Sequence, residues 1–467
     1  MDQKIVIPKP HTPKQDIIMR CFFIPGLLEL WVSCGTKFGK TLGGISGISA
    51  KAWVTKNGIF RWTAPIYSQV KYGYRYAKKI FPGEPHVKLN ESGPYITIPK
   101  TDTMLEFRSA KNPEDLEGEG SAGTGLDEAA KMVRQAYDSI KTTHTRTGAL
   151  IAGFSTPRGK NWFHEKCMES KDIMEWCLKN NKPPTHIFLT ARTIDNPFIR
   201  PEAVDEARRS LPDRLFRQYY LAEFVDDGTV FVGTRECIQN PENELELFGR
   251  VQRWIHSDAK QRNVVIGVDW AKSEDYTVFY ALDYEKKPYE TVGIMRFQGI
   301  NYTQAVKELV LFARSFKKAE LVKHDKTGIG GVLEDLLGAT PLAFEGYVFS
   351  NTSKSYIINN LILGFERRTL TIPNWTTLLQ ELDSYEVHVS EAGNMKYSAP
   401  SGMHDDLVIG LALALSAAEE FSTKAMNLRF LEDLPNTKLS MDDYYNDMIE
   451  DTDQLSNQIF GFNINDD

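Results

Sequence analysis

The stretch "SCGTKFGKT", residues 33–41, decides how the N-terminal half of this chain is expected to fold. Gly39, Lys40 and Thr41 have the Gly-Lys-Ser/Thr order of a phosphate-binding loop, in which backbone N–H groups and a helix N-terminus surround phosphate oxygens. Cys34 stands where that pattern begins with glycine, and a glycine follows one position late. The stretch predicts a nucleotide site with a displaced glycine; a surface turn that contains Gly-Lys-Thr is the alternative.

The flanking sequence places this loop between a strand and a helix. "LLELWVS" (27–33) is typical of a buried strand, and small and apolar residues after the loop favour a helix. Further strands are expected at 58–65, in "GTGLDEA", in "GALIAGFSTP" and at 185–191, with helices between them, and "YITIP" with "TMLEFRSA" reads as a hairpin. Alternating strands and helices predict an α/β domain with a parallel-rich sheet covered on both faces.

Two further strand ends supply the chemistry that such a loop needs. Asp127 can hold Mg²⁺ through water, and Glu128 can orient the water that attacks a γ-phosphate. Ser155 and Thr156 could sense that phosphate. The alternatives are helix-capping acids and an ordinary polar turn. We therefore expect ATP and Mg²⁺ to bind at the loop and these strand ends, with Thr41 and Asp127 as ligands of the metal. The residues expected to contact them are Gly35, Thr36, Lys37, Gly39, Lys40, Thr41, Asp127, Ser155 and Thr156.

The C-terminal half has a different pattern. "NVVIGVDWA" begins a strand meander that "DYTVFYALDY" and "YETVGIMRFQG" continue, followed by a helix, the strand "AELVKHD" and a second helix. We expect an ATPase domain at 1–225, a polar linker at 226–262, a mixed-sheet domain at 263–422 and an acidic tail at 423–467.

Acidic residues at strand and helix ends of the second domain predict a metal site. Asp269 and Asp325 end two strands, and Asp405 and Asp406 open an apolar helix. Clustered carboxylates repel and are relieved by Mg²⁺ or Mn²⁺, and two such ions can clamp the oxygens of a phosphodiester. Helix capping is the alternative for the acids near helix starts, whereas Asp269 inside an apolar strand end is costly without a partner.

Two neighbours of these acids have structural alternatives of their own. Asp275 reads as a turn residue that could help at a second metal, and His404 reads as structural rather than catalytic. Lys326 and Lys396 flank the expected cleft and could touch a DNA backbone, although surface lysines are usually only solvated.

The charge distribution permits nucleic acid as a partner. The 467 residues carry a net charge of −7, but residues 441–467 hold eight acids and no Lys or Arg, so residues 1–440 sum to +1. DNA should then be gripped mainly through its phosphates, with little base readout. Five scattered cysteines fit reduced thiols in a cytoplasm, and we expect neither a secretion signal nor a membrane span.

Residues 8 to 420 resemble the large subunit of a tailed-bacteriophage terminase, the DNA-packaging motor. The resemblance rests on "HTPKQ", "CGTKFGKT", "GLDEAA", "STPRGKNWF", "QYYLAEFVDDGTVF", "GVDWAKSEDYTVF" and "YSAPSGMHDDLVIGLALAL". It implies an N-terminal P-loop ATPase that drives double-stranded DNA into a procapsid, and a C-terminal ribonuclease H-like nuclease that cuts concatemeric DNA.

The same resemblance implies roles and partners. Gln15 would read the adenine, and Asp269, Asp325 and Asp406 would hold the nuclease metals, with Asp405 sharing that work. The implied partners are double-stranded DNA, a portal protein on the procapsid and a terminase small subunit. A homo-oligomeric ring is expected on the procapsid in the host cytoplasm, and a monomer is compatible with the isolated chain.

Two departures from the family pattern stand out. One is Cys34. The other is Glu117, which occupies the place of an arginine that acts on the neighbouring subunit in the family, so that this arginine stays unassigned among Arg108, Arg134 and Arg146.

Two other functions remain open at this point. One is a helicase-like repair ATPase with an attached nuclease, and the other is a non-enzymatic docking protein whose acidic tail binds a portal.

Overall fold

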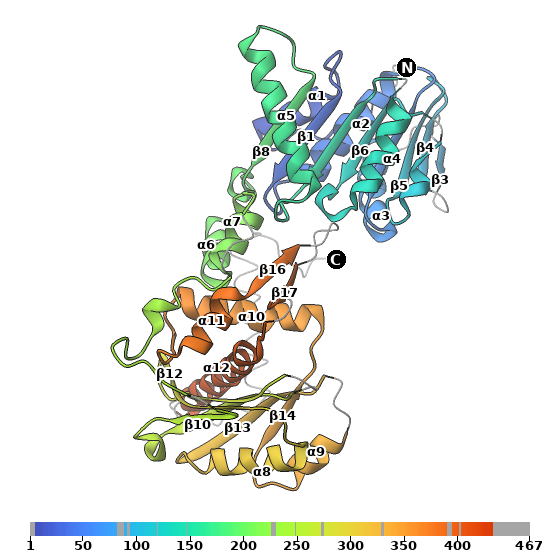
Figure 1. Ribbon diagram of the computed structural model, residues 1–467. Coiled ribbons are helices and arrows are strands. Elements are labelled where there is room, and N and C mark those ends of the chain that lie inside the picture. Colours follow the sequence, from blue (N-terminus) through green and yellow to red (C-terminus); the bar gives the residue numbers. More distant parts are fainter. Residues whose placement is uncertain are drawn as a thin grey trace, which may run out of the picture.

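A computed structural model gives the fold of the chain as two lobes (Figure 1). The N-terminal lobe holds the sheet of strands β1 to β8, and the C-terminal lobe holds the sheet of β9 to β15. Helices α6 (Pro201–Ser210) and α7 (Asp213–Tyr220) lie between them. The structure describes residues 5–81, 88–90, 94–118, 120–145, 147–225, 230–247, 249–271, 275–327, 331–389, 395–400 and 403–432.

The sheet of the N-terminal lobe has the strand order β3-β4-β5-β2-β6-β7-β1-β8. Only the pairings of β3 with β4 and of β4 with β5 are antiparallel, which confirms the predicted parallel-rich sheet and the hairpin at its edge. Strand β7 lies between β1 and β6, so the loops that follow these three strands emerge side by side. The strands are β1 (Glu29–Cys34), β2 (Ile59–Ala64), β3 (Lys88–Asn90), β4 (Tyr95–Ile98), β5 (Thr103–Ser109), β6 (Gly123–Asp127), β7 (Leu150–Ser155) and β8 (His186–Ala191).

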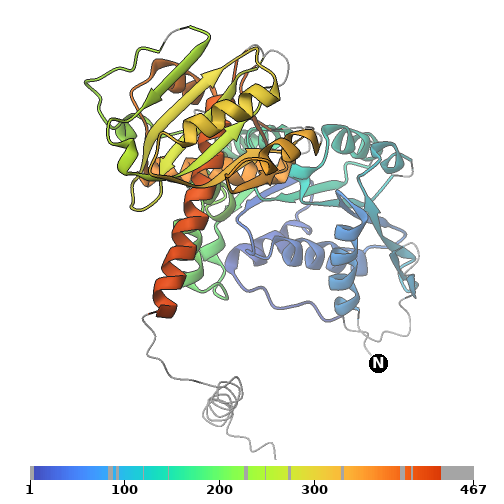
Figure 2. The same cartoon turned by 90° about the horizontal axis from the view of Figure 1, so that it is seen from below.

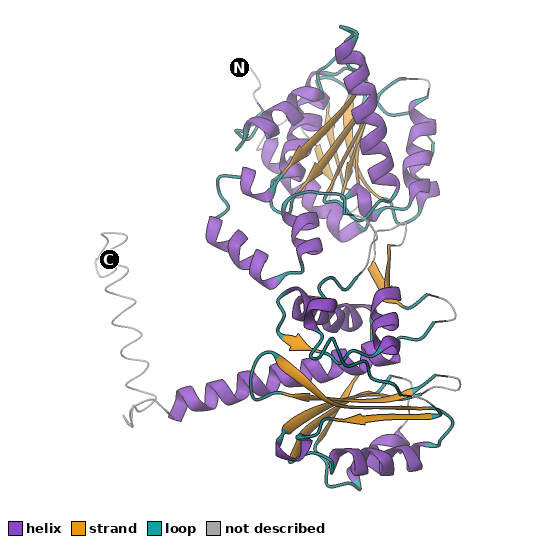
Figure 3. Ribbon diagram, turned by 60° about the vertical axis from the view of Figure 1, so that its left-hand side comes forward, coloured by secondary structure: helices purple, strands orange, loops and turns teal. Residues whose placement is uncertain are grey.

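Helices cover both faces of this sheet (Figure 3). Helices α1 (Pro13–Cys21), α2 (Lys40–Val54) and α3 (Tyr67–Ile80) bury their apolar residues in one core, and α4 (Arg134–His144) and α5 (Trp162–Lys179) bury theirs in another. Strand β1 is buried at every position because it pairs with a strand on each side and both faces of the sheet are covered. Short 3₁₀ helices are η1 (Pro113–Leu116), η2 (Ala129–Lys131), η3 (Thr193–Asp195), η4 (Arg235–Cys237) and η5 (Ala259–Gln261).

The sheet of the C-terminal lobe has the order β14-β13-β10-β11-β12-β15, with β9 also paired to β12. The predicted antiparallel meander is confirmed as β10-β11-β12, and β13 runs parallel to β10. Helices α8 and α9 cover one face, and α10, α11 and α12 cover the other (Figure 1). The strands are β9 (Val251–Ile255), β10 (Asn263–Asp269), β11 (Thr277–Asp283), β12 (Tyr289–Phe297), β13 (Lys318–Asp325), β14 (Phe344–Tyr347) and β15 (Leu370–Thr371).

The remaining elements of this lobe are its helices and a separate hairpin. A separate hairpin pairs β16 with β17. Helix α12 projects beyond the sheet as the longest helix in the view of Figure 2. No helix within the described ranges combines the length and apolarity that crossing a membrane requires. These elements are α8 (Tyr302–Ala313), α9 (Gly331–Gly338), α10 (Asn351–Glu366), α11 (Thr376–Ser384), β16 (Glu386–Val389), β17 (Met395–Ser398) and α12 (Asp406–Glu432).

The stretch expected as a linker contributes to the second lobe. Strand β9 pairs with β12, and Val230, Phe231 and Cys237 are buried in the same core as α10 and α12. Helix α12 also continues past the expected boundary at residue 422 and ends at Glu432. Residues 433–467, the larger part of the expected tail, lie outside the described residues.

Two glycines allow α12 to lie directly against β10. A Cβ added to Gly267 would be 2.1 Å from the carbonyl oxygen of Gly410 and 2.4 Å from the backbone nitrogen of Ala414. A Cβ added to Gly410 would be 2.8 Å from a methyl group of Val278 on β11. This close approach sets the first turn of α12 beside the end of β10.

Helix α7 is bonded to both lobes. At its C-terminal end, the backbone N–H of Thr36 in the phosphate loop donates to the carbonyl of Tyr219 at 2.7 Å. At its N-terminal end, the backbone N–H of Asp213 donates to the carboxylate of Glu366, the last residue of α10, at 3.1 and 3.3 Å.

Candidate functional sites

The first site lies where β1, β6 and β7 end. The Lys40 ammonium is 2.8 Å from Oε1 of Glu128 and 3.4 Å from Oγ1 of Thr156. The Thr41 hydroxyl donates to both carboxylate oxygens of Asp127, at 3.0 and 3.1 Å. The structure therefore brings together the loop and the acids that the sequence assigned to one nucleotide site.

The backbone of the loop explains the displaced glycine. Cys34 is the last residue of β1, is fully buried and pairs with Ala191, so it sits in regular strand rather than in the turn. A Cβ on Gly35 would lie 2.5 Å from Oγ1 of Thr193, so glycine is needed there for close approach. The left-handed positions come later, at Lys37 (φ 60°) and Gly39 (φ 96°).

Gln15 reaches the loop from α1. Its side-chain amide donates to the carbonyl of Phe38 at 3.0 Å, and its Oε1 accepts from the backbone N–H of His11 at 2.6 Å. Residue 15 is thus fixed beside the loop by Thr12, which caps α1 and accepts from the Gln15 N–H at 3.1 Å. Adenine reading by Gln15 stays a prediction.

The pKa values of the two acids of this site are shifted in opposite directions. Burial raises the pKa of Asp127 to about 6, against the opposing effect of Lys40. Burial alone would also raise the pKa of Glu128, but Lys40 and Lys131 lower it to about 2. Glu128 is therefore ionised at neutral pH, as a residue that orients an attacking water must be. A cation bound beside Asp127 would favour the ionised form of that carboxylate.

The residues fit a triphosphate with its metal. Lys40 is buried with only protein carboxylate to neutralise it, and among the described residues the buried Ser155 hydroxyl has no hydrogen-bond partner. The hydroxyl of Thr41 and the carboxylate of Asp127 form an oxygen pair of the kind that Mg²⁺ prefers. Phosphate oxygens and a divalent cation would satisfy each of these groups.

The second site lies in the C-terminal lobe, in a pocket of about 220 Å³ that we call the aspartate pocket. Asp269 and Asp325 end the neighbouring parallel strands β10 and β13, whose register pairs Val268 with His324 one residue earlier. Carboxyl ends of parallel strands meet at one edge, so the two carboxylates converge as the sequence predicted. The lining residues are Asp269, Trp270, Asp275, Asp325, Thr327, Phe349, Lys354, Asp405, Asp406 and Ile409.

Helix α12 brings the other acids to this pocket. Oδ2 of Asp406 accepts from the backbone N–H of Tyr276 at 3.2 Å and lies 3.5 Å from Nδ1 of His404. Asp275, His404 and Asp406 can place one ligand atom each within 4.8 Å of one another. Asp275 therefore lines the aspartate pocket and His404 borders it through Asp406, and their roles there stay predictions.

The aspartate pocket holds more negative charge than its own cations offset. Burial raises the pKa of Asp269 well above its usual range, and Asp406, Asp325 and Asp405 raise it further. Burial likewise raises the pKa of Asp406 to about 6. Carboxylate oxygens held this close fit hard divalent cations, which would favour their ionised forms.

Three functional neighbours were not expected from the sequence. Lys354 lies 3.0 Å from Oδ2 of Asp405. Glu381 accepts from the backbone N–H of Leu407 at 2.9 Å and pairs with Arg296 at 3.0 Å, so it anchors the first turn of α12. Burial raises the pKa of Glu381 to about 8 despite Arg296.

The arginine candidates that the structure describes, Arg108 and Arg134, are paired away from both sites. Arg108 contacts Glu106 at 3.0 Å, and Arg134 contacts Glu165 at 2.8 Å, so each is engaged within its own chain. Arg146 lies outside the described residues. Glu117 accepts a hydrogen bond from Ser139 at 3.1 Å. The arginine that acts in trans stays unassigned.

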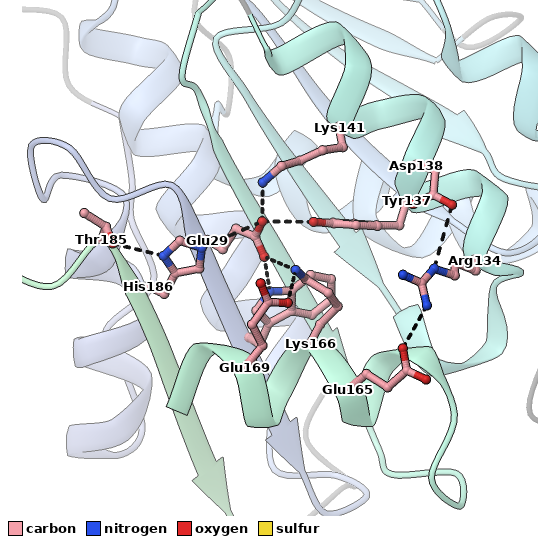
Figure 4. A network of polar contacts seen from close by, with 11 residues as sticks. Glu29, Arg134, Tyr137, Asp138, Lys141, Glu165, Lys166, Glu169, Thr185 and His186 are labelled. Atoms are coloured by element: carbon pink, nitrogen blue, oxygen red, sulfur yellow. Dashed lines mark hydrogen bonds and ion pairs between the residues drawn. The ribbon is translucent and has the colours of Figure 1, made fainter. Parts of the chain in front are cut away.

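A third polar cluster, on strand β1, has a structural character (Figure 4). The fully buried Glu29 accepts from the Trp31 indole at 2.8 Å and from the Tyr137 hydroxyl at 2.9 Å, and it pairs with Lys141 and Lys166. Burial opposes its charge, but these partners lower the pKa of Glu29 to about 2. Every contact is internal, so the cluster ties β1 to α4 and α5.

Comparisons with known proteins show which family the chain belongs to. No protein-family model matches the chain. The terminase large subunit of Thermus virus P23-45 is 32% identical over 376 residues, which cover 76% of this chain and 74% of that protein. The chain belongs to the terminase large-subunit family. Its function is therefore that of a viral DNA-packaging motor subunit with ATPase and nuclease activities, and the helicase-like alternative is not favoured.

Solved structures of large terminases are also similar to this chain. The large terminase of a thermophilic bacteriophage has a TM-score of 0.50 at 13% identity, covering 88% of this chain and 99% of that one, and this likeness shows the terminase fold. The large terminase nuclease of phage G20c, solved with bound magnesium, is 28% identical, covers 40% of this chain and 97% of that one, and has a TM-score of 0.36.

Proposed function

We propose that this terminase subunit uses the phosphate-loop site to hydrolyse ATP and the aspartate pocket to cut DNA, with the residue roles that follow. The observation that carries the proposal is the joint geometry of the two sites: Thr41 contacts Asp127, and the aspartates assigned from the sequence line one pocket, in a single chain.

At the first site, Lys40 would bind the terminal phosphates, and Thr41 with Asp127 would hold the Mg²⁺. Glu128, already ionised, would orient the attacking water once Lys40 turns to the phosphates. Thr156 lies within reach of Lys40 and follows the strand between β1 and β6, so it is placed to respond to the phosphate.

At the second site, Asp269, Asp325 and Asp406 would hold Mg²⁺ or Mn²⁺, with Asp405 beside them. Divalent metal supplies Lewis-acid stabilisation of a phosphodiester and activation of water. The protein's own part is to hold the carboxylates in place: Thr327 donates its N–H to Asp325 at 2.7 Å, and Tyr276 donates to Asp406.

The assembly around this chain is part of the same proposal. We infer that the subunit acts as a ring on the portal of a procapsid in the host cytoplasm, together with a small subunit that presents the DNA. We further propose three working units: an ATPase domain up to residue 225, a nuclease domain that includes β9 and continues to the end of α12 at Glu432, and a tail beyond it.

Separation of the two activities tests the residue assignment. Lys40→Ala should abolish ATP hydrolysis and leave Mn²⁺-dependent nicking of plasmid DNA intact, because Lys40 lies only at the first site. Asp269→Ala should do the reverse. Asp335→Ala, at an exposed acid of α9, is the matched control and should change neither. The assignment fails if either active-site variant keeps the activity attributed to it.

A further inference from the structure

Lys354 is the only Lys or Arg among the described residues that line the aspartate pocket. Its ammonium is 3.0 Å from Asp405 and lies 6.0 Å from the centre of the Tyr385 ring. The side chain is 28% exposed, so it is neither buried as a structural cation nor free in solvent. An ammonium group that pairs with one of these carboxylates competes with a divalent metal for the same oxygen atoms.

The backbone that carries Lys354 is held firmly. Ser350 caps α10, accepting from the Ser353 N–H at 3.1 Å and donating its own N–H to the Ser353 hydroxyl at 2.7 Å. The Tyr347 hydroxyl donates to the Ser353 carbonyl at 2.9 Å. The root of Lys354 is therefore fixed, whereas its flexible stem lets the ammonium reposition.

A second hollow of about 200 Å³ adjoins the aspartate pocket and shares two residues with it, Phe349 and Lys354. Its described lining contains no carboxylate. It offers hydroxyl, amide and ammonium groups at the positively polarised start of α10, which together suit an anion. The lining residues are Phe349, Ser350, Asn351, Lys354, Ser355, Lys396, Tyr397 and Ser398.

We propose that Lys354 serves both hollows in turn. While the carboxylates lack metal, the Lys354 ammonium neutralises Asp405. When divalent cations bind the carboxylates, the ammonium moves into the adjoining hollow and contacts a phosphate of the DNA strand that is bound at the aspartate pocket. Lys354 is then a DNA-contact residue that becomes available only in the metal-loaded pocket. This inference rests on the proposed nuclease function of the aspartate pocket.

Metal binding gives the first test, independent of cutting. Terbium luminescence sensitised by Trp270, which lines the pocket, reports occupancy, and competition with Mn²⁺ gives the affinity. Lys354→Met should tighten the apparent Kd for Mn²⁺ about fivefold, the size expected for losing a part-exposed ion pair. Lys318→Met is the matched control, because Lys318 pairs with Glu320 at 2.7 Å at the opposite end of β13 from Asp325 and lines neither hollow; it should leave the Kd unchanged.

DNA binding gives the second test. With Ca²⁺ in place of Mn²⁺, Lys354→Met should weaken binding of a short duplex severalfold, and with EDTA it should have little effect, since Lys354 is then occupied by Asp405. Lys354→Arg keeps the charge and should restore Ca²⁺-dependent binding. Melting curves for each variant report folding, and Lys354→Gln replaces Lys354→Met if the latter does not fold.

The outcomes separate this inference from the proposed function. If the full-length protein binds no metal in the pocket, the nuclease assignment itself fails. If it binds Mn²⁺ and cuts DNA, but Lys354→Met leaves the metal affinity unchanged and weakens DNA binding equally in Ca²⁺ and EDTA, the role of Lys354 is overturned.

Discussion

Gly267→Ala tests whether the contact between α12 and β10 positions the aspartate pocket. The added Cβ would lie 2.1 Å from the Gly410 carbonyl oxygen, and ordinary contact begins near 3.4 Å. The obstacle is backbone on both sides, so no side chain can rotate away and the helix must shift by about 1.3 Å. Overpacking of this kind costs about 1–3 kcal/mol.

The same shift would move Asp406 relative to Asp269. Displacement of a reacting group by about 1 Å can lower a rate about 100-fold. We therefore expect Gly267→Ala to reduce Mn²⁺-dependent nicking of plasmid DNA by about two orders of magnitude, while ATP hydrolysis stays near the wild-type rate because β1, β6 and β7 are untouched.

The control is Gly331→Ala at the start of α9, in the same lobe. Among the described residues, no atom lies within 4 Å of a Cβ added there, and alanine favours a helix over glycine by up to about 1 kcal/mol. This variant should be as stable as wild type or more so, with normal nicking. A folded Gly267→Ala protein that nicks DNA at the wild-type rate would refute the positioning argument.

Two further predictions concern the N-terminal lobe. The pKa of Glu29 is about 2 against an ordinary 4.5, so its ionised form stabilises the fold above about pH 4.5, and this contribution is lost as the pH falls toward 2. Glu29→Gln should lower the free energy of unfolding by about 3 kcal/mol at neutral pH, and urea titrations should show that this free energy falls less steeply with decreasing pH than in the wild type. Gly35→Ala should abolish ATPase activity, because the added Cβ would clash with Thr193. Cys34→Gly should lower the melting temperature, because Cys34 is buried in β1, without raising the rate of ATP hydrolysis. A Cys34→Gly protein that hydrolyses ATP faster than the wild type would contradict our interpretation of the loop.

Strand-end residues were the most predictable part of both sites. Asp127, Asp269 and Asp325 follow apolar runs, and the geometry of parallel strands brings such ends to one edge whatever the details of packing. Asp405 and Asp406 could both be placed near the site because acids that open a long apolar helix lie at the edge of the core, and only the family resemblance favoured Asp406.

Contacts that depend on tertiary packing were not predictable. Lys354 belongs to a polar helix start and has the sequence appearance of a solvated surface lysine. Nothing local marks Gly267 as the point where a helix touches a strand. Strand β9 was missed because its sequence, "VQRWI", lies in a polar region, and only pairing with β12 makes it a strand.

Helix α7 has a consequence for how the two enzymes share one body. The Thr36 N–H donates to Tyr219 and belongs to the loop that we expect to bind phosphate, so a triphosphate that accepted from it would compete with the last turn of α7. At the opposite end of α7, the Asp213 N–H donates to Glu366, the last residue of the helix that carries Lys354. We therefore expect nucleotide binding at the phosphate loop to be transmitted through α7 to the lobe that cuts DNA.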